Sequence, residues 1–286
     1  MRKCRSTLLY SALFDLAATF AMAHAQAPVA IPPGGKPVPW AAVSIHPSDP
    51  ARNQANDGWS DQPNGISGTG MSVRQMLSQA YHFGFMPFRD EELEGLPSWA
   101  STARYDVRER VDADDVETFR KLSGMTMADT LAAFAARQYT GEMLMGQAVL
   151  AERFHLKAHY DVRSRRVYLL SVDKGGPHLK ATANTSNEGT MSFGNGMLSG
   201  KGVPIAAMVN LLAYPAERVV VDRTALPGRF DFELHFAPSN AGVSTEPSTL
   251  PDFFSAVRQE LGLKLESSRA DVPVLVIDHI EEPTPN

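Results

Sequence analysis

The chain has 286 residues, of which 43% are hydrophobic and 21% are charged, and it contains a single cysteine. These values are ordinary for a globular protein with one large domain or two small ones, and they exclude a small fold that depends on disulfides. The formal net charge of −5 argues against nucleic acid or an anionic membrane surface as the main partner.

The first 25 residues have the three parts of a secretory signal peptide. Three of residues 1–5 are Lys or Arg, residues 8–23 are mostly apolar, and Ala23-His24-Ala25 is a small-x-small cleavage site. The alternative is an uncleaved membrane anchor, but the apolar stretch is interrupted by Asp15 and is short for a span. We therefore expect a signal peptide over residues 1–25 and a periplasmic or secreted mature protein that begins at Gln26.

Cleavage would remove Cys4 together with three basic residues and one aspartate, which changes the net charge from −5 to −7. The mature chain would then have no disulfide and no thiol chemistry. No later segment approaches 18 uninterrupted apolar residues, so we expect a protein that does not span a membrane after cleavage.

Proline and glycine are concentrated in residues 26–40, which predicts an extended linker. Residues 41–46 predict a short strand, and residues 47–62 read as a polar loop. We place one α+β domain over residues 41–286.

An internal repeat is the main feature of that domain. Residues 66–70 (ISGTG) recur as residues 198–202 (LSGKG), and the match continues without a gap into two amphipathic helices. Ser72 is a candidate N-cap of the first helix, and Pro204 suits the first turn of the second.

Two further blocks follow in the same order in each half. Residues 104–107 (RYDV) correspond to 229–232 (RFDF), and each block opens an alternating strand, although the first alternates only roughly. Amphipathic helices over 143–154 and 250–261 are then each followed by a predicted β-hairpin, with turns at 163–165 and 268–270.

The sequence thus predicts an α+β fold of two pseudo-symmetric strand–helix–strand–helix–hairpin halves, residues 41–176 and 187–282, which share a core. Residues 112–142 form a helical insertion in the first half only. Coincidence between small α+β motifs is the alternative, and three blocks in one order argue against it.

His155 and His159 are the strongest candidates for a metal site, because four residues of separation places both on one face of a predicted strand. No third ligand stands at a recognisable spacing, so a solvent-facing strand is the simpler interpretation. We expect no metal and no cofactor.

Asp106 and Asp231 occupy equivalent places, and paired carboxylates can perform acid–base catalysis. Each stands two residues after an arginine, Arg104 or Arg229, so a structural turn or ion pair explains the repeat more simply.

Glycines precede both repeat helices, and a phosphate cradle is conceivable there. Their spacing fits neither the P-loop nor the dinucleotide fingerprint, and Lys201 is not followed by Ser or Thr. A tight strand-to-helix turn is the better explanation of these residues: Gly65, Gly68, Gly70, Gly194, Gly196, Gly200 and Gly202.

No Gly-x-Ser-x-Gly nucleophile elbow is present, and a mature chain without cysteine has no cysteine nucleophile. Among the three tryptophans, Trp40, Trp59 and Trp99, we single out Trp59 as a possible ligand platform because it stands among Asn and Asp. A lid over the core is the competing interpretation.

Several short blocks together resemble an uncharacterised family of exported proteins abundant in soil bacteria of the Acidobacteria type, a domain of unknown function. They are Ala42-Val43-Ser44-Ile45-His46-Pro47, Pro97-Ser98-Trp99, Ala151-Glu152-Arg153-Phe154, Asp173-Lys174-Gly175-Gly176-Pro177, Val221-Asp222-Arg223-Thr224, Gly228-Arg229-Phe230-Asp231-Phe232 and Ile277-Asp278-His279. The resemblance implies export and an α+β fold, but no activity. Similar domains are also fused to BlaR-type sensor metallopeptidases, which implies sensing or binding outside the cytoplasm. One departure is Ala225, where the family pattern has glycine.

These observations favour a non-enzymatic binding, sensing or scaffolding domain with a ligand groove between its halves. Its expected partner is an envelope protein, a peptide or a small molecule, and no nucleic acid. The alternative is an extracytoplasmic hydrolase whose site is assembled from scattered carboxylates and histidines, which would require ionisable residues to converge in one pocket. A third possibility, from fold analogy alone, is an assembly module like the ring-building domains of secretion pores.

Overall fold

The structure is a computed structural model that describes residues 32–51, 53–183, 189–194, 196–237 and 249–284. The expected signal peptide, its cleavage site and the first residues of the expected linker lie outside the described residues. Over the described ranges the chain forms seven α-helices and three four-stranded sheets, which confirms an α+β fold. No helix in these ranges is long and apolar enough to cross a membrane.

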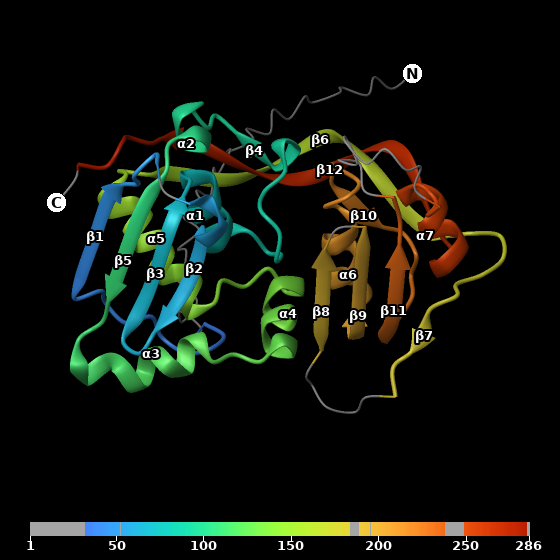
Figure 1. The fold of residues 1–286 in the computed structure, drawn as a ribbon, viewed down its shortest axis with the longest axis horizontal. Coiled ribbons are helices and arrows are strands. Elements are labelled where there is room, and N and C mark those ends of the chain that lie inside the picture. The colour runs from blue at the N-terminus through green and yellow to red at the C-terminus, as the bar shows by residue number, and fades with distance from the viewer. Residues whose placement is uncertain (1–31, 52, 184–188, 195, 238–248, 285–286) are drawn as a thin grey trace, which may run out of the picture. The chain divides into compact units, whose positions relative to one another are not determined.

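The first sheet is antiparallel and carries two helices on one face (Figure 1). In spatial order it contains β1 (Ala42–Pro47), β5 (Tyr105–Arg110), β3 (Gly65–Met71) and β2 (Gly58–Gln62). The expected polar loop over 47–62 is wrong at its end, because residues 58–62 pair with β3. The helices are α1 (Val73–Tyr81), which starts with a Ser72 capping box, and α5 (Gly141–Arg153).

The second half repeats this strand order in its own antiparallel sheet. That sheet contains β7 (Lys180–Ala181), β11 (Arg229–His235), β9 (Met197–Pro204) and β8 (Thr190–Gly194). Here α6 (Ile205–Leu212) follows β9 as α1 follows β3, and α7 (Phe253–Leu261) stands where α5 does. The shared order agrees with the repeat; a single rotation that relates the two halves stays a prediction.

The predicted hairpins are wrong. Residues 157–172 form one continuous strand, β6 (Lys157–Val172), and residues 263–279 form another, β12 (Leu263–His279). The two strands pair with each other from Leu263 opposite Val172 to Ile277 opposite Ala158. Both expected turns, 163–165 and 268–270, contain no Gly, Pro or Asn that would force a reversal. Their polar side chains instead occupy the middle of the ribbon at half-buried or exposed positions.

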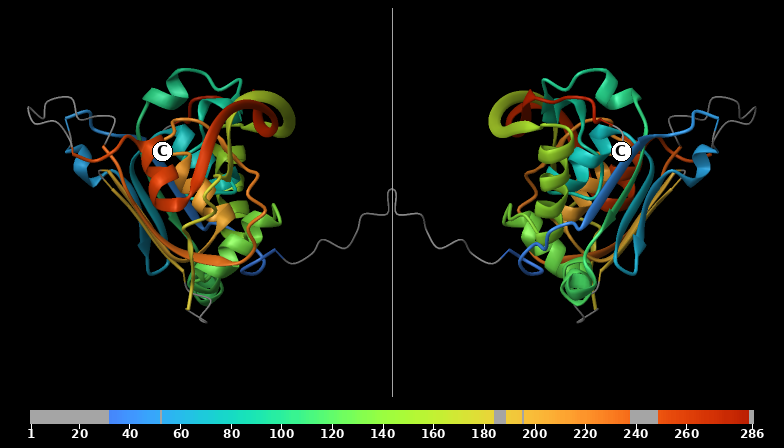
Figure 2. Two further views of the ribbon diagram at one scale, coloured as in Figure 1. Left: turned by 90° about the vertical axis from the view of Figure 1, so that its right-hand side faces the viewer. Right: turned by 90° about the vertical axis from the view of Figure 1, so that its left-hand side faces the viewer.

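A short strand from each half completes this ribbon into the third sheet. β4 (Leu93–Glu94) pairs in parallel with β12, and β10 (Val220–Asp222) pairs in parallel with β6. The spatial order β10-β6-β12-β4 therefore joins each half's short strand to the other half's long one. Figure 1 shows this sheet running across both of the other sheets, and Figure 2 shows helices between the ribbon and the outer sheets.

Each half has a main core cluster, and both clusters use the ribbon. The first-half cluster includes Leu275 and Ile277 from β12, although β12 belongs by sequence to the second half. The second-half cluster includes Leu170 from β6 together with Leu263 from β12. The two halves therefore have separate core clusters, and the ribbon of β6 and β12 contributes side chains to both.

The insertion expected over 112–142 is helical, as predicted. It contains a short 3-10 turn (Ala113–Asp115), α3 (Val116–Ser123) and α4 (Met127–Ala135). Leu131 of α4 packs against the second-half core, so the insertion reaches both halves. The remaining elements are α2 (Trp99–Thr102) and 3-10 turns at Gln54–Asn56 and Asp90–Glu92.

Residues 32–40 lie along α3 and α5 without a helix or strand of their own. The backbone N–H of Gly141 donates to the Pro33 carbonyl over 3.1 Å, and the indole N–H of Trp40 donates to the Met145 carbonyl over 3.2 Å. This part of the Pro- and Gly-rich stretch is therefore fixed to the domain.

The departure from the family pattern at Ala225 lies in a strained turn. Ala225 has φ 54°, a left-handed conformation that favours glycine. The turn is fixed on both sides, because Asp222 accepts hydrogen bonds from the Thr224 N–H and hydroxyl, and the Thr224 hydroxyl accepts from the Leu226 N–H.

We expect a fragment of residues 26–187 not to fold by itself. It lacks β12, so β6 loses its partner along its whole length and the first-half core loses Leu275 and Ile277. Such a fragment should aggregate or lose its near-ultraviolet circular dichroism, and adding residues 189–286 as a separate chain should restore it. Cooperative unfolding of the soluble fragment alone would contradict this role of the ribbon.

Replacing Ala225 with glycine should stabilise the protein. Relief of the left-handed strain is worth roughly 1–2 kcal/mol, and glycine's greater freedom in the unfolded chain offsets part of it, which leaves about 0.5–1 kcal/mol. Ala103, at φ −61°, is the matched control, and A103G should lose about 0.5–1 kcal/mol. Urea titration measures both; an A225G variant as destabilised as A103G would show that the turn is not strained.

Candidate functional site

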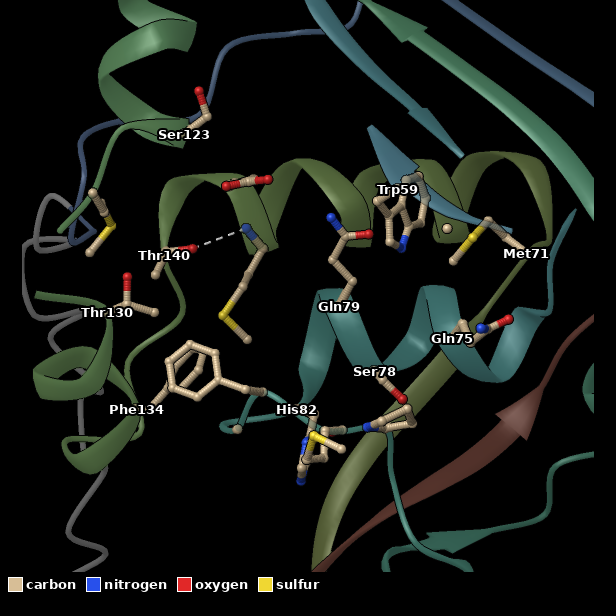
Figure 3. Close-up of a pocket in the computed structure, with 18 of the residues that line it drawn as sticks. Trp59, Met71, Gln75, Ser78, Gln79, His82, Ser123, Thr130, Phe134 and Thr140 are labelled. Carbon is tan, nitrogen blue, oxygen red and sulfur yellow. Dashed lines mark hydrogen bonds between the residues drawn. The ribbon is translucent and has the colours of Figure 1, made fainter. Parts of the chain in front are cut away.

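A pocket of about 410 Å³ lies beside α1 within the first half. Its walls come from β2, α1, the 84–87 segment, α4, and the first turn of α5 (Figure 3). We call it the methionine pocket after four of its lining residues: Met71, Met86, Met125 and Met143. Trp59, Phe85 and Phe134 add aromatic surface. Methionine and aromatic side chains offer polarizable and adaptable walls to an apolar ligand.

The insertion builds a large part of this pocket. Residues 122–142 contribute Leu122, Ser123, Met125, Thr130, Phe134, Thr140 and Glu142. The second half has no equivalent segment between β11 and α7 among the described residues. The pocket therefore lies where the two halves differ, which separates it from the architecture that they have in common.

Polar groups from α1 face the pocket at i, i+4 and i+7. Gln75, Gln79 and His82 line it, whereas Met76, Leu77 and Ala80 on the same helix belong to the buried core. In Figure 3, Gln79 lies between Trp59 on one side and Phe134 on the other.

Most of these polar groups already have partners. Gln75 Oε1 accepts from the Ser72 N–H over 2.8 Å, and Thr140 Oγ1 accepts from the Met143 N–H over 3.2 Å. Both ring nitrogens of His82 face oxygens, Met86 O at 2.7 Å and Glu92 Oε1 at 3.2 Å.

Two polar groups of the pocket remain available. Within the described chain, neither the amide of Gln79 nor the carboxyl of Glu142 makes a hydrogen bond, and both side chains are half-buried. They are the groups that could orient a bound ligand.

Glu142, which is half-buried, belongs to a pair of neighbouring carboxyls at the pocket. Its partner Glu109 comes from β5, is only 6% exposed, and lines with Glu142 a space of about 20 Å³ beside Trp40 and Trp59. Burial and the neighbouring charge of Glu142 raise the pKa of Glu109 to about 8. Burial and then Asp61 raise the pKa of Glu142. Buried acids with raised pKa values are typical of functional sites, although structural networks also produce them.

The two histidines singled out from the sequence do not share a strand face. His155 precedes β6 at φ 50°, and its ring bonds Glu281 over 3.0 Å, whereas His159 lies in β6 and bonds Asp278 over 2.7 Å. Within the described chain no group of three or more His, Cys, Asp or Glu side chains is placed to hold a metal ion.

Asp106 and Asp231 serve the backbone at equivalent places. Asp106 Oδ1 accepts from the Gly70 N–H over 2.9 Å, and Asp231 Oδ1 accepts from the Gly202 N–H over 2.7 Å. Both glycines have left-handed φ, 65° and 63°, and both lie at irregularities in the pairing with the adjacent strand. The two carboxylates come from different sheets, so the simpler structural interpretation is supported.

The glycines of the repeat permit close packing. A Cβ on Gly68 would lie 2.7 Å from Met71 Cγ, and one on Gly200 would lie 2.7 Å from Val203 Cγ2. Because the carboxylates of Asp106 and Asp231 already occupy the N–H groups of Gly70 and Gly202, these N–H groups do not form a phosphate cradle.

Trp59 packs on the core, as a lid would, and also lines a pocket, as a ligand platform would require. It lies in β2 opposite Gly68, packs against two core clusters, and lines the methionine pocket. Trp40 bonds the α5 backbone, and Trp99 packs on the first-half core.

Sequence reasoning missed Glu109 and Glu142. One signal existed, because the alternation of Tyr105, Val107 and Val111 is broken only by a glutamate at the inward position 109. An acidic residue at a core position of a strand is a local inconsistency of the kind found at functional sites.

The expected groove between the halves also has a counterpart. A second cavity of about 280 Å³ is lined by residues of the 82–92 segment on one side and of α6 and 219–221 on the other. We call it the inter-half cavity.

Comparison with known proteins gives one match. A family described as "Protein of unknown function (DUF3738)" matches residues 74–280, which include most of both halves. No curated protein and no solved structure matches the chain.

We expect E109Q to stabilise the protein at neutral and higher pH. The pKa of Glu109 rises from an ordinary 4.5 to about 8 in the folded state, so above pH 4.5 only the unfolded state readily loses its proton. The contribution of Glu109 to stability is therefore fully present below pH 4.5 and is lost as the pH rises to about 8, whereas the neutral amide of glutamine does not titrate. Near pH 5 the two proteins should be similar, and at pH 8 E109Q should be more stable by about 1–4 kcal/mol.

Urea titrations from pH 4.5 to 8.5 measure this difference. E117Q is the matched control, because Glu117 is exposed on α3 and pairs only loosely with Lys121 at 3.7 Å. If the pH dependence of E109Q parallels that of wild type and of E117Q, Glu109 is not the group that titrates.

Proposed function

The chain belongs to the DUF3738 family of proteins of unknown function, and we propose that it is an exported, non-enzymatic domain that binds a small, largely apolar ligand in the methionine pocket. The observation that carries this proposal is the composition of the pocket. About 410 Å³ is enclosed by methionine and aromatic side chains, with Gln79 and Glu142 as uncommitted polar groups.

The origin of the pocket walls supports binding as the function. The insertion contributes exposed helices to one half, and a segment added to a duplicated scaffold is a common source of a new site. Glu142 and Gln79 would orient a ligand that carries a hydrogen-bond donor, because a buried carboxyl and an amide oxygen both accept.

Export is supported by the residues that resemble a signal peptide. The resemblance to soil-bacterial proteins, and to domains fused to BlaR-type sensor metallopeptidases, also favours ligand sensing outside the cytoplasm. Sequencing the N-terminus of protein recovered from the cell envelope tests this: Gln26 supports export, and Met1 on cytosolic protein contradicts it.

A hydrolase is the second candidate, because two ionisable residues do converge at the pocket floor. Acid–base hydrolysis by paired carboxylates requires both groups to reach the substrate. Only Glu142 lines the methionine pocket, while Glu109 faces the space of about 20 Å³ beneath it. His82, the other ionisable group of the pocket, is held by Met86 and Glu92. Binding without turnover therefore fits the geometry better.

Nile red, an uncharged apolar dye, should bind the mature protein saturably and with enhanced emission. T130F fills the pocket from α4 and should weaken binding at least tenfold. A132F adds the same side chain to the same helix at an exposed position that does not line the pocket, so its affinity should equal that of wild type.

Equal binding by all three proteins would contradict the methionine pocket as the site. Turnover of an aryl glycoside or ester by wild type that disappears in E142Q would instead support the hydrolase.

A further inference from the structure

The inter-half cavity has apolar walls and a different chemical character from the methionine pocket. Its second-half side is formed by Val209 and Ala213 of α6 and by residues 219–221, and its floor includes Val272 and Pro273 of β12. Its first-half side is the segment from His82 to Glu92. The halves approach closely here, since a Cβ on Gly84 would lie 2.1 Å from Asn210 Oδ1.

Arg89 brings a positive charge to this cavity on a half-buried side chain. Its guanidinium carbon lies 5.3 Å from the ring centroid of Tyr214, a second-half residue, so the side chain extends across the boundary between the halves. Nε and Nη2 of Arg89 are buried, and neither donates to any atom of the described chain. A buried guanidinium N–H without an acceptor is unfavourable, and a carboxylate or similar anion is its best partner.

The acidic groups near Arg89 do not supply that partner. Glu92 also lines the cavity, but its Oε1 faces His82 Nε2 at 3.2 Å and its Oε2 accepts from the Arg89 backbone N–H over 2.9 Å. Asp271 is exposed, and it is not a hydrogen-bond partner of Nε or Nη2 of Arg89 within the described chain. Glu92 therefore partly balances the charge of Arg89 without bonding to its guanidinium.

Arg137, the second arginine that lines the cavity, is committed to aromatic rings. Arg137 lies 4.8 Å from the ring centroid of Phe83 and 5.4 Å from that of Tyr160. Its stacked guanidinium keeps a second positive charge at the same cavity, which makes the site more favourable to an anion.

We propose that the inter-half cavity binds a small organic carboxylate, with its apolar body against the valine-rich walls and its head group at the guanidinium of Arg89. A planar guanidinium pairs well with a planar carboxylate, and the apolar walls favour an anion that carries an apolar body over inorganic phosphate. The size of about 280 Å³ suits a body of several carbon atoms. This site goes beyond the proposed function, because it is a different cavity with different chemistry.

The test uses the full mature protein and three probes: octanoate, its uncharged analogue octanamide, and inorganic phosphate. Octanoate should raise the thermal unfolding midpoint saturably, while octanamide and phosphate should not at the same concentrations. R89Q should weaken octanoate binding at least tenfold in calorimetry. R218Q is the matched control, because Arg218 stacks on Tyr168 at 4.7 Å in the same manner but does not line the cavity, and it should bind octanoate as wild type does.

A second readout separates binding from a structural role of Arg89. Because two of its donors are buried without acceptors, R89Q without ligand should be at least as stable as wild type. In ¹⁵N spectra, the Arg89 Nε–H signal should shift on octanoate addition while that of Arg218 does not.

No saturable binding of octanoate, binding that persists in R89Q, or a shift by phosphate alone would each overturn the proposal. A loss of several degrees in ligand-free R89Q but not in R218Q would assign Arg89 to the fold instead. T130F should leave octanoate binding unchanged, so failure at this cavity and failure at the methionine pocket are separately visible.

Discussion

The antiparallel pairing of β6 with β12 is the interaction on which the rest of the structure depends. Their register runs unbroken from Leu263 opposite Val172 to Ile277 opposite Ala158. Each end of this ribbon closes a different core, and each edge receives a short strand, β4 or β10. The two segments are separated by about a hundred residues of chain, so this pairing has a larger loop-closure cost than local structure, and neither core is complete without it.

This exchange explains why the halves meet closely enough to make a cavity between them. Had each half formed the expected hairpin, no strand pairing would have joined the two halves in the third sheet. With strands shared, the end of α1 and the segment after it are held against α6, where Gly84 allows contact with Asn210. The position of Arg89 beside Tyr214 follows from that constraint.

The sequence predicted the parts of the fold that rest on local patterns. The Ser72 cap, the amphipathic helices and the equivalence of Asp106 with Asp231 follow from residues close in sequence, and the glycine N–H bonds at both aspartates show one device used twice. The hairpins could not be excluded in this way, because alternation along a strand does not identify the partner strand. Both partners were even correctly located as strands; only long-range pairing decides that β6 joins β12.

The methionine pocket was hidden for a related reason. Its residues come from β2, α1, α4 and α5. Its two available polar groups, Gln79 and Glu142, are far apart in sequence. Glu109 was visible as a break in the alternation of β5, but its meaning depends on Glu142, which the insertion brings to the same place. The repeat was enough to propose binding between the halves, whereas the pocket in which we place a ligand could be located only from the packing.

The two cavities share one short segment, and beside each lie ionisable side-chain atoms without hydrogen-bond partners in the described chain. His82, Met86 and Pro87 line both of them, with the carboxyls of Glu109 and Glu142 near one and the guanidinium of Arg89 near the other. A buried polar or ionisable group without a bonded partner lowers stability, and apolar residues of similar size would pack in either place at lower cost. Glu92 shows the contrast, since its carboxylate is as deeply placed but is bonded. Burial alone would raise the pKa of Glu92, yet the hydrogen bonds from His82 and from the Arg89 backbone lower it. The fold thus bonds Glu92 fully, whereas the carboxyls of Glu109 and Glu142 and two nitrogens of the Arg89 guanidinium make no hydrogen bond within the described chain. This contrast is the physical reason for proposing that ligands bind beside these groups.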